Sequence, residues 1–223
     1  MKKGDERGRV ASGISGFDDL CEGGFIANST NLITGESGSG KTNFMLQFLY
    51  TGASVHSEKG IFISFGQNAE EIDEDSNSFG WNLSKLGSNL KVVWIDPRKS
   101  LKAIRDEIHS AISRSGAKRV CIDCLDLLIS SKESEMLEFI LELFASIKKV
   151  GVVSIISYNS RENADNRELE FIKSLADGVI QLLPCWGDEE TDRALRIVKM
   201  RQTSHSRAHN LFEITDKGMI VYE

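Results

Sequence analysis

Residues 35–42, with the sequence GESGSGKT, have the types and spacing that bind a polyphosphate. They fit the pattern G-x-x-x-x-G-K-[ST] and stand between an apolar run at 30–35 and a helical pattern at 41–57. In such a loop the glycines let backbone N–H groups curl round the phosphates, and the helix N-terminus adds its positive end. We expect Lys41 to reach the β- and γ-phosphates of ATP and the Thr42 hydroxyl to ligate Mg²⁺. The expected cofactor-binding residues of this loop are Gly35, Glu36, Ser37, Gly38, Ser39, Gly40, Lys41, Thr42 and Asn43.

An aspartate supplies the second element of the expected site. Asp123 ends the apolar run at 118–123, where the carboxyl ends of parallel strands meet at one edge of a sheet. We expect this carboxylate to lie beside the phosphate loop and to hold Mg²⁺ through water. Asp126, three residues later, is more typical of a turn or a helix cap.

The strand expected at 60–65 lacks the carboxylate that ATP-splitting enzymes usually place at the end of such a strand. Gly66 and Gln67 stand there instead. Glutamine cannot accept a proton from water at useful cost, and losing a general base typically lowers a rate by about 10² to 10⁴. The expected catalytic residues are Gln67, Lys41 and Asp123. Because none of them replaces the missing base at the strand end, hydrolysis is expected to be weak or absent.

Other groups near this strand leave alternatives open. Gln67 could position water without deprotonating it, as glutamine does in GTPases, where geometry and charge stabilisation dominate. Glu70 and Glu71 could fold back, but they fall in the expected first turn of a helix, a place that acids favour for the dipole alone. Hydrolysis could also be lost while binding survives.

Apolar runs and helical patterns alternate along most of the chain. Strands are expected at 30–35, 60–65, 90–96, 118–123, 151–158 and 177–183, and helices at 41–57, 68–86, 100–115, 133–149 and 166–176. Near-continuous apolar strands separated by helices predict an α/β fold with a twisted, mostly parallel sheet and helices on both faces. After residue 183 the runs at 193–201, 209–215 and 218–223 follow one another without helices and predict an antiparallel extension at one sheet edge.

Composition narrows the class of protein. The net charge of -6 argues against a nucleic-acid or anionic-membrane surface built on bulk charge. No apolar run approaches the ~20 residues of a membrane helix, so we expect no membrane insertion and a cytoplasmic location. Cys121 and Cys124 have C-x-x-C spacing but lie in a strand-like run, where residues three apart point to opposite faces. A redox or metal role is not favoured.

Several motifs together resemble the KaiC family of RecA-like P-loop ATPases. They are ASGISGFDDLCEGGF at 11–25, the phosphate loop, SFGWNLSKL at 78–86, RVCID at 119–123, ADGVI at 176–180 and KMRQTSHS at 199–206. The resemblance implies an N-terminal tail at 1–10 and a single RecA-like domain at 11–223. It also implies self-association in a hexameric or other ring, with ATP between neighbouring subunits.

The resemblance assigns further residues to the nucleotide. Ser78 and Phe79 would lie near the adenine. Lys199 and Arg201 would reach the phosphates held by the adjoining subunit, and because they are two apart on a strand, both side chains should emerge on one face. The residues implied around these two cations are Thr203, His205 and Arg193.

This chain departs from the family pattern at two places. Relatives typically end the strand at 60–65 with two glutamates, and Gly66 and Gln67 replace them here. Asn28 stands where the family has a turn glycine, and asparagine is the next-best residue for a positive φ. The first departure bears on hydrolysis, and the second leaves the fold intact.

Three functions remain open at this point. The first is an ATP-binding, weakly hydrolysing ring subunit whose nucleotide state sets assembly or the binding of an unknown protein partner. The second is an active ATPase or an autokinase of the KaiC kind, for which Ser157, Tyr158 and Ser160 offer hydroxyls. The third is a recombinase paralogue that binds single-stranded DNA, but Arg161 and Arg167 stand beside the acids Glu162, Asp165 and Glu168, which makes a phosphate track unconvincing.

Overall fold

The computed structural model describes residues 8–128, 133–160, 167–183 and 193–222. Its main sheet has nine strands in the order β11-β10-β9-β8-β3-β7-β6-β4-β5. The strands that pair in parallel are β3 (Thr30–Gly35), β4 (Gly60–Ser64), β5 (Leu90–Trp94), β6 (Arg119–Asp123), β7 (Val153–Asn159) and β8 (Gly178–Leu183). The antiparallel strands are β9 (Arg193–Met200), β10 (Asn210–Thr215) and β11 (Gly218–Val221). The predicted α/β class and the antiparallel extension are confirmed.

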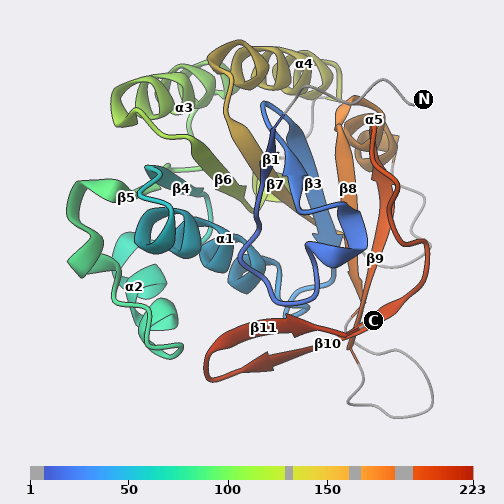
Figure 1. Ribbon diagram of the computed structural model, residues 1–223. Coiled ribbons are helices and arrows are strands. Elements are labelled where there is room, and N and C mark those ends of the chain that lie inside the picture. Colours follow the sequence, from blue (N-terminus) through green and yellow to red (C-terminus); the bar gives the residue numbers. More distant parts are fainter. Residues whose placement is uncertain (1–7, 129–132, 161–166, 184–192, 223) are drawn as a thin grey trace.

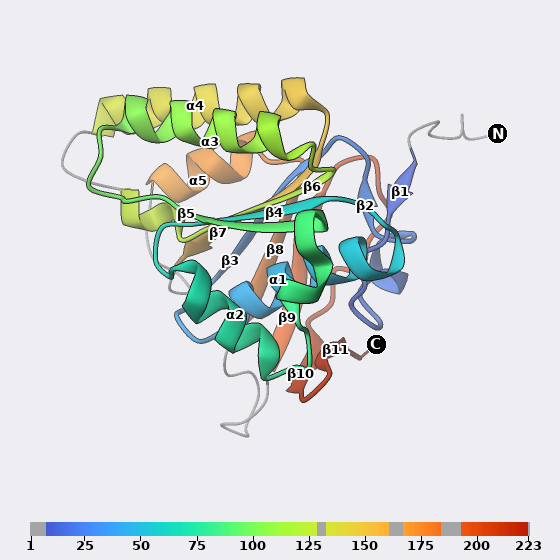
Figure 2. The same ribbon diagram turned by 90° about the vertical axis from the view of Figure 1, so that its left-hand side faces the viewer.

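Helices cover both faces of this sheet, as Figure 2 shows. On one face lie α3 (Leu101–Ser115), α4 (Glu133–Val150) and α5 (Arg167–Leu175), and on the other lie α1 (Lys41–Val55) and α2 (Ala69–Asn77). Two apolar cores follow from this arrangement, because alternate residues of each buried strand point to opposite faces. On β3, Ile33 joins the core under α1, whereas Leu32 joins the core under α3 and α4.

The second helix is shorter than the sequence pattern predicted. It was expected over 68–86, but α2 ends at Asn77, and a 3-10 segment follows at Leu83–Asn89. The chain turns at Gly80, whose φ of 72° favours glycine. Asn82 then caps the 3-10 segment by accepting a hydrogen bond from the N–H of Lys85. The amphipathic pattern continued through this turn because both segments pack on the same core, so the helix prediction was wrong beyond residue 77.

The N-terminal segment adds a small second sheet. β1 (Arg9–Val10) pairs antiparallel with β2 (Phe25–Ile26). Asn28, in the turn that follows, has a φ of 61°, which confirms the positive φ expected for the residue at this turn. The turn leads the chain into β3, which carries the phosphate loop at its far end.

Candidate functional site

The phosphate loop joins β3 to α1 at the carboxyl edge of the parallel sheet (Figure 1). Gly40 precedes the helix with a φ of 99°, a backbone conformation that side chains other than glycine rarely adopt. Gly35 is equally constrained, because a Cβ there would lie 2.5 Å from the carbonyl oxygen of Leu182 on β8. These glycines allow the backbone to fold tightly between the strand and the helix N-terminus, which is what a bound phosphate requires.

Lys41, the first residue of α1, folds back over the loop. Its Nζ donates to the carbonyl oxygens of Gly35 at 2.9 Å and Glu36 at 2.7 Å. The side chain is buried, and burial lowers the pKa of Lys41, while the carboxylate of Asp123 acts in the opposite direction. The ammonium therefore stands at the loop with few competing solvent contacts, where a phosphate oxygen would be a strong partner.

Thr42 and Asp123 meet across the edge of the sheet. The Thr42 hydroxyl donates to Oδ2 of Asp123 at 3.0 Å. Oδ1 of the same carboxylate accepts a hydrogen bond from the Ser157 hydroxyl on β7, and that hydroxyl accepts from the N–H of Cys124 at 2.7 Å. Asp123 is buried and fixed from both sides. A hydroxyl and a fixed carboxylate beside a phosphate loop form a donor set that suits Mg²⁺, which prefers oxygen ligands.

The end of β4 places Gln67 at the same edge. The Ser64 hydroxyl accepts the N–H of Gly66 at 3.2 Å and the N–H of Gln67 at 2.9 Å, which fixes the turn after the strand. The Gln67 side chain donates through Nε2 to Oδ2 of Asp75 on α2 at 2.7 Å. The carboxylate nearest to Gln67 thus comes from a helix, not from the strand end.

The helix-start interpretation of the acids after Gln67 is confirmed. Asn68 caps α2 by accepting from the N–H groups of Glu70 and Glu71, and Glu71 returns a bond by accepting from the N–H of Asn68 at 2.8 Å. This reciprocal capping box holds the Glu71 carboxylate at the helix start. Glu70 is an exposed residue of the first turn.

A cavity of about 320 Å³ lies over the loop. The predicted residues that line it are Ser37, Gly38, Gly40, Lys41, Thr42, Asn43, Gln67 and Asp123. Gly35, Glu36 and Ser39 lie behind it and contact Lys41. Three lining residues, Asp75, Cys124 and Asn159, were not among the predicted site residues.

Each of these three residues reaches the cavity through tertiary structure. Asp75 comes from α2, and Asn159 ends β7. Asp126 lies in the 3-10 turn Leu125–Leu128, which agrees with the turn expected for it. Its carboxylate accepts from the N–H of Asn159 at 2.9 Å and from its Nδ2 at 2.8 Å, so Asp126 also holds a cavity residue in place. A spacing of eight residues between Gln67 and Asp75 carries no motif that would have indicated their contact.

Cys124 adopts a φ of 60° directly after β6, an uncommon value for a side chain other than glycine. Burial raises the pKa of its thiol to about 12, with Asp123 and Asp126 adding to the effect. Cys121 points instead into the core under α1, where its Sγ lies 3.7 Å from the carbonyl oxygen of Met45. Cys121 therefore lies in the core, whereas Cys124 lines the cavity over the phosphate loop.

Ser78 and Phe79 lie beyond the end of α2 and do not line this cavity. The Phe79 ring stacks on Trp81 with 4.7 Å between centroids, and Trp81 stacks on Tyr50 of α1 at 5.5 Å. The Ser78 hydroxyl donates to the carbonyl oxygen of Asp75 at 2.6 Å. Within one subunit, Phe79 therefore belongs to an aromatic cluster with Trp81 and Tyr50 of α1.

The hairpin of β10 and β11 packs directly against the phosphate loop. A Cβ on Gly40 would lie 2.9 Å from Cδ1 of Ile214 and 3.2 Å from Cε of Met219. The predicted antiparallel extension therefore forms one wall beside the loop (Figure 1). Sequence reasoning placed this hairpin at a sheet edge but gave no sign of its contact with the loop, because that contact depends on how the sheet twists.

Lys199 of β9 and Arg201, one residue beyond the strand, emerge on the same side, toward the end of α5, as their spacing predicted. Nζ of Lys199 donates to the carbonyl oxygens of Lys173 at 3.0 Å and Ser174 at 3.2 Å, near the end of α5. Arg201 donates to the Ser174 carbonyl at 3.4 Å and lies 3.7 Å from Oδ1 of Asp177. Burial lowers the pKa of Lys199, and the neighbouring Arg201 adds to this.

These two cations stand at the opposite end of the sheet from the loop of their own chain. Met200 pairs with Gly178 at the start of β8, whereas the phosphate loop follows the end of β3. Figure 1 shows β9 running from the hairpin end of the sheet up to α5. Arg201 also lines a cavity of about 390 Å³ with Lys148 and Asp177.

Thr203 stays close to the cations, but Arg193 does not. Thr203 Oγ1 donates to the carbonyl oxygen of Arg201 at 3.2 Å and accepts from Arg9 at 2.8 Å, and His205 Nδ1 lies 2.8 Å from the carbonyl oxygen of Ser206. Arg193 begins β9 beside Phe212, about 20 Å from Lys199 at the ~3.3 Å rise of a strand residue. The grouping of Arg193 with Lys199 and Arg201 is therefore not what the structure shows, because the strand carries them to opposite ends of the sheet.

Two other hypotheses from the sequence depend on residues in β7 and in the segment that follows it. Ser157 is engaged with Asp123 and Cys124, and the Tyr158 side chain is buried. Arg161, Glu162 and Asp165 lie outside the described residues. Among the described helices, none is long and apolar enough to cross a membrane.

The fold and the site together define a P-loop protein with a RecA-like arrangement of strands. The family model for the KaiC ATPase matches residues 10–223. The chain belongs to the KaiC family of ATPases.

Individual relatives agree with this. The circadian clock oscillator protein KaiC of Prochlorococcus marinus subsp. pastoris is 31% identical over 231 residues, covering 96% of this chain and 45% of the relative. The circadian clock protein KaiC2 of Synechocystis sp. is 31% identical over 227 residues, covering 96% of this chain and 40% of the relative. The chain thus spans less than half the length of these curated relatives.

A solved structure matches over its whole length. The crystal structure of a KaiC-like protein from the hyperthermophilic archaeon Pyrococcus horikoshii has a TM-score of 0.88 and 32% identity, and the match covers 97% of this chain and 100% of that one. The fold of this chain is therefore that of a KaiC-like protein.

Proposed function

We propose that this chain is an ATP-binding subunit of a ring, that it hydrolyses ATP slowly, and that its nucleotide state controls assembly or the binding of a partner protein. The observation that carries the proposal is the geometry at the carboxyl edge of the sheet. Lys41, Thr42 and Asp123 stand in one cavity with the loop backbone, while Gln67 occupies the strand end where a carboxylate would activate water.

ATP would bind with its phosphates on the loop. Backbone N–H groups and the N-terminus of α1 favour the negative charge, and Lys41 adds a charge-assisted hydrogen bond. Mg²⁺ would be held by the Thr42 hydroxyl and, through water, by Asp123. The bound ion supplies charge neutralisation of the phosphates when present.

Slow turnover follows from the group that Gln67 provides. Phosphoryl transfer depends mainly on positioning and charge stabilisation, and the loop, Lys41 and Asp123 retain those functions. An amide can orient a water molecule but cannot take its proton, so the strand end lacks a general base of the kind that typically contributes about 10² to 10⁴ in rate.

Assembly is proposed from the placement of Lys199 and Arg201. They lie at the other end of the sheet from their own phosphate loop, so a triphosphate that they contact has to come from a neighbouring subunit. Their positions beside the cavity lined by Lys148 and Asp177 give that neighbour an accessible face. A closed ring, in which each subunit offers the loop on one side and the cations on the other, satisfies every site.

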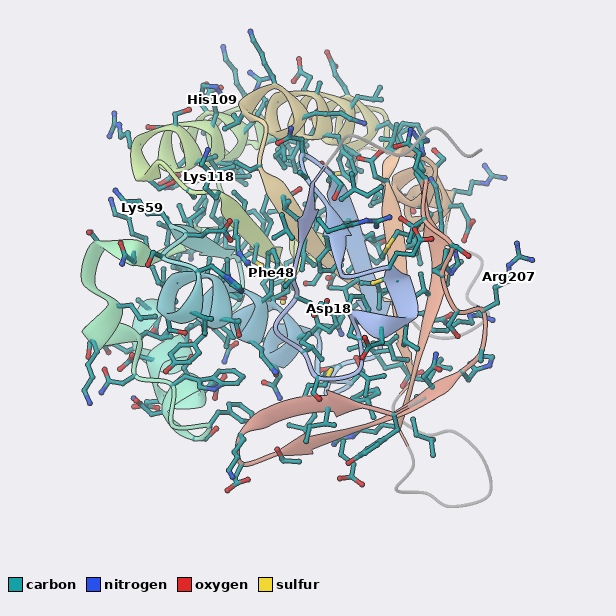
Figure 3. All side chains as sticks on the ribbon, in the orientation of Figure 1. Asp18, Phe48, Lys59, His109, Lys118 and Arg207 are labelled. Carbon is teal, nitrogen blue, oxygen red and sulfur yellow. The ribbon has the colours of Figure 1, made fainter. Side chains whose placement is uncertain are left out.

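The experiment compares Lys41→Ala with Lys59→Ala. Lys59 is exposed beside the start of β4, well away from the loop-side hairpin in Figure 3, and it provides the same change of charge. Calorimetric titration with Mg-ATP should show about a 10- to 100-fold weaker affinity for Lys41→Ala, because a hydrogen bond to a charged group contributes about 1.5–3 kcal/mol. Lys59→Ala should bind as the parent does.

Turnover of the parent is measured in the same preparation. A steady-state rate well below ~1 per second supports slow hydrolysis, since typical enzymes turn over at about 1–10³ per second. Equal affinities for the two lysine variants would refute nucleotide binding at the loop. An ordinary rate for the parent would refute the proposed slow hydrolysis and leave binding intact.

A further inference from the structure

A carboxylate enters the phosphate cavity from an unexpected part of the chain. Asp75 stands two turns into α2 and lines the same cavity as Lys41, Thr42 and Asp123. Its helix is fixed in place at its start by the Asn68 and Glu71 capping box and by Ile72, which is fully buried. The strand end lacks an acid, but the helix that follows brings one back to the same edge of the sheet.

A hydrogen bond from Gln67 orients the carboxylate of Asp75. Nε2 of Gln67 donates to Oδ2 of Asp75 at 2.7 Å. An ionised carboxylate only accepts hydrogen bonds, so the NH₂ group of the amide has to face Asp75, which leaves Oε1 free for another donor. The Ser64 hydroxyl holds the backbone of Gln67, so the Gln67 side chain links the end of the strand to Asp75 from a fixed position.

Two other acids of α2 make different contacts. Glu71 accepts the Asn68 N–H in the capping box, and Asp73 accepts from the Asn77 side chain at 3.2 Å. Neither lines the cavity over the phosphate loop, and Asp75 does. Asp75 is also exposed, so a proton that it takes up can pass directly to solvent.

We propose that Asp75 is the general base for the slow hydrolysis and that Gln67 positions it. This inference rests on the proposed function, because it assumes that ATP occupies the loop. Asp75 would accept a proton from water as the water oxygen forms a bond to the γ-phosphorus. The bond from the γ-phosphorus to the oxygen that bridges to the β-phosphate breaks, ADP leaves with that electron pair, and inorganic phosphate forms. The proton then passes from Asp75 to solvent.

The Gln67–Asp75 contact can be tested without ATP. In ¹⁵N-labelled protein, the side-chain NH₂ signals of Gln67, assigned by their loss in Gln67→Ala, should shift with pH along the titration of a single carboxyl group. Asp75→Asn should abolish this titration. Asp73→Asn removes a charge from the same helix away from the cavity and should leave it unchanged. A Gln67 signal that does not move with pH in the parent would overturn the proposed hydrogen bond between Gln67 and Asp75.

Single-turnover hydrolysis tests the chemical role. Asp75→Asn should lower the rate of γ-phosphate release by about 10²-fold, the lower range for removal of a general base. Affinity for a non-hydrolysable ATP analogue should not weaken, because the substitution removes a negative charge near the phosphates. Gln67→Ala should also lower the rate, and Asp73→Asn should match the parent.

The outcomes separate the two proposals. If the parent fails to bind the analogue, the proposed function itself is wrong. If the parent binds and Asp75→Asn turns over as fast as Asp73→Asn, Asp75 is not the base, while the proposed function stands. A parent that binds but releases no phosphate would likewise overturn the role given to Asp75.

Discussion

The hydroxyl of Thr42 and the carboxylate of Asp123 are 3.0 Å apart, although 81 positions separate them in the sequence. Thr42 lies in the first turn of the helix after β3 and Asp123 ends β6, and the parallel sheet brings both to its carboxyl edge. This pair defines where a metal-bound triphosphate would be held. It also gives a direct test of the metal's role.

Asp123→Asn should weaken binding of Mg-ATP by about 10- to 100-fold, because the carboxylate supports Mg²⁺ and a charge-assisted interaction is worth about 1.5–3 kcal/mol. Binding of ATP without Mg²⁺ should not weaken, since the substitution removes a negative charge beside the phosphates. Calorimetry with and without Mg²⁺ measures both, with Asp73→Asn as the control. The same enhancement by Mg²⁺ in Asp123→Asn and in the parent would contradict the assignment.

Much of this site could be predicted from the sequence. The phosphate loop is local, because glycine spacing and a helix start within eight residues specify it. Asp123 could be placed because strands of a parallel sheet share one carboxyl edge. The turn at Asn28 could be predicted from its tolerance of positive φ, and its φ of 61° confirms this.

The remaining contacts depend on tertiary geometry that no short pattern encodes. Asp75 reaches Gln67 because α2 packs beside the sheet edge, and Ile214 reaches the loop because the hairpin twists across it. Arg193 was grouped with Lys199 on the family resemblance, whereas the extended strand separates them. The end of α2 was misplaced because the apolar pattern continued across Gly80 into a second segment on the same core.

Assembly should depend on the cations of β9. Lys199→Ala and Arg201→Ala should each bind ATP as a monomer but lose most of the ATP-dependent increase in mass, because each removes a positive charge meant for the neighbour's phosphates. Lys91→Ala, on the opposite edge strand β5, is the matched control. Light scattering with and without a non-hydrolysable analogue measures the mass.

Two results would count against this assembly. If Lys199→Ala and Arg201→Ala assemble as Lys91→Ala does, these cations do not complete a neighbour's site. A parent that stays monomeric with and without nucleotide would refute nucleotide-controlled assembly. Thermal unfolding of each variant checks that loss of the contacts with the end of α5 has not disrupted the fold.

The described cysteines should be unreactive at neutral pH. Burial raises the pKa of Cys21 and of Cys124 from 9.0 to about 12, which leaves about a thousandfold smaller thiolate fraction at pH 8. In a Cys185→Ser background, reaction with an aromatic disulfide reagent should be slow in the folded protein and fast after denaturation. Cys185 is replaced because it lies outside the described residues.

The same shift predicts a loss of stability in alkali. The folded pKa of these thiols lies above the unfolded value, so their contribution is fully present below pH 9.0 and is lost as pH rises through about 12. Denaturant midpoints should therefore fall across this range. Fast labelling of Cys124 in folded protein at pH 8 would show that its thiol is not protected.

Gly66 offers a place to restore the strand-end carboxylate. A Cβ there would lie 3.5 Å from the Cys124 Sγ and 3.7 Å from Leu127 Cδ1, which are ordinary contacts. Gly66→Glu should therefore fold normally and raise the hydrolysis rate by about tenfold or more, because a second base becomes available at the strand end. Gly66→Ala adds a side chain without the carboxylate and should not raise the rate. Equal rates for the two variants would show that a carboxylate at this position does not reach the water.

Gln67→Glu is a less simple change, because Asp75 already stands 2.7 Å from the nitrogen that the substitution removes. Two carboxylates at that separation share a proton, so their titrations are coupled and the shared proton is lost only at higher pH. We expect Gln67→Glu to give little gain at pH 6 and to gain activity only as pH rises and the shared proton leaves. The double variant Gln67→Glu, Asp75→Asn removes the second charge, so its acid limb should move back to lower pH, and at pH 7 it should exceed Asp75→Asn by about 10². The full pH profile of single-turnover hydrolysis for all three variants is the measurement. A Gln67→Glu profile that overlays that of the double variant would mean that the two carboxylates do not meet, and that residue 67 turns away from α2 once it is charged.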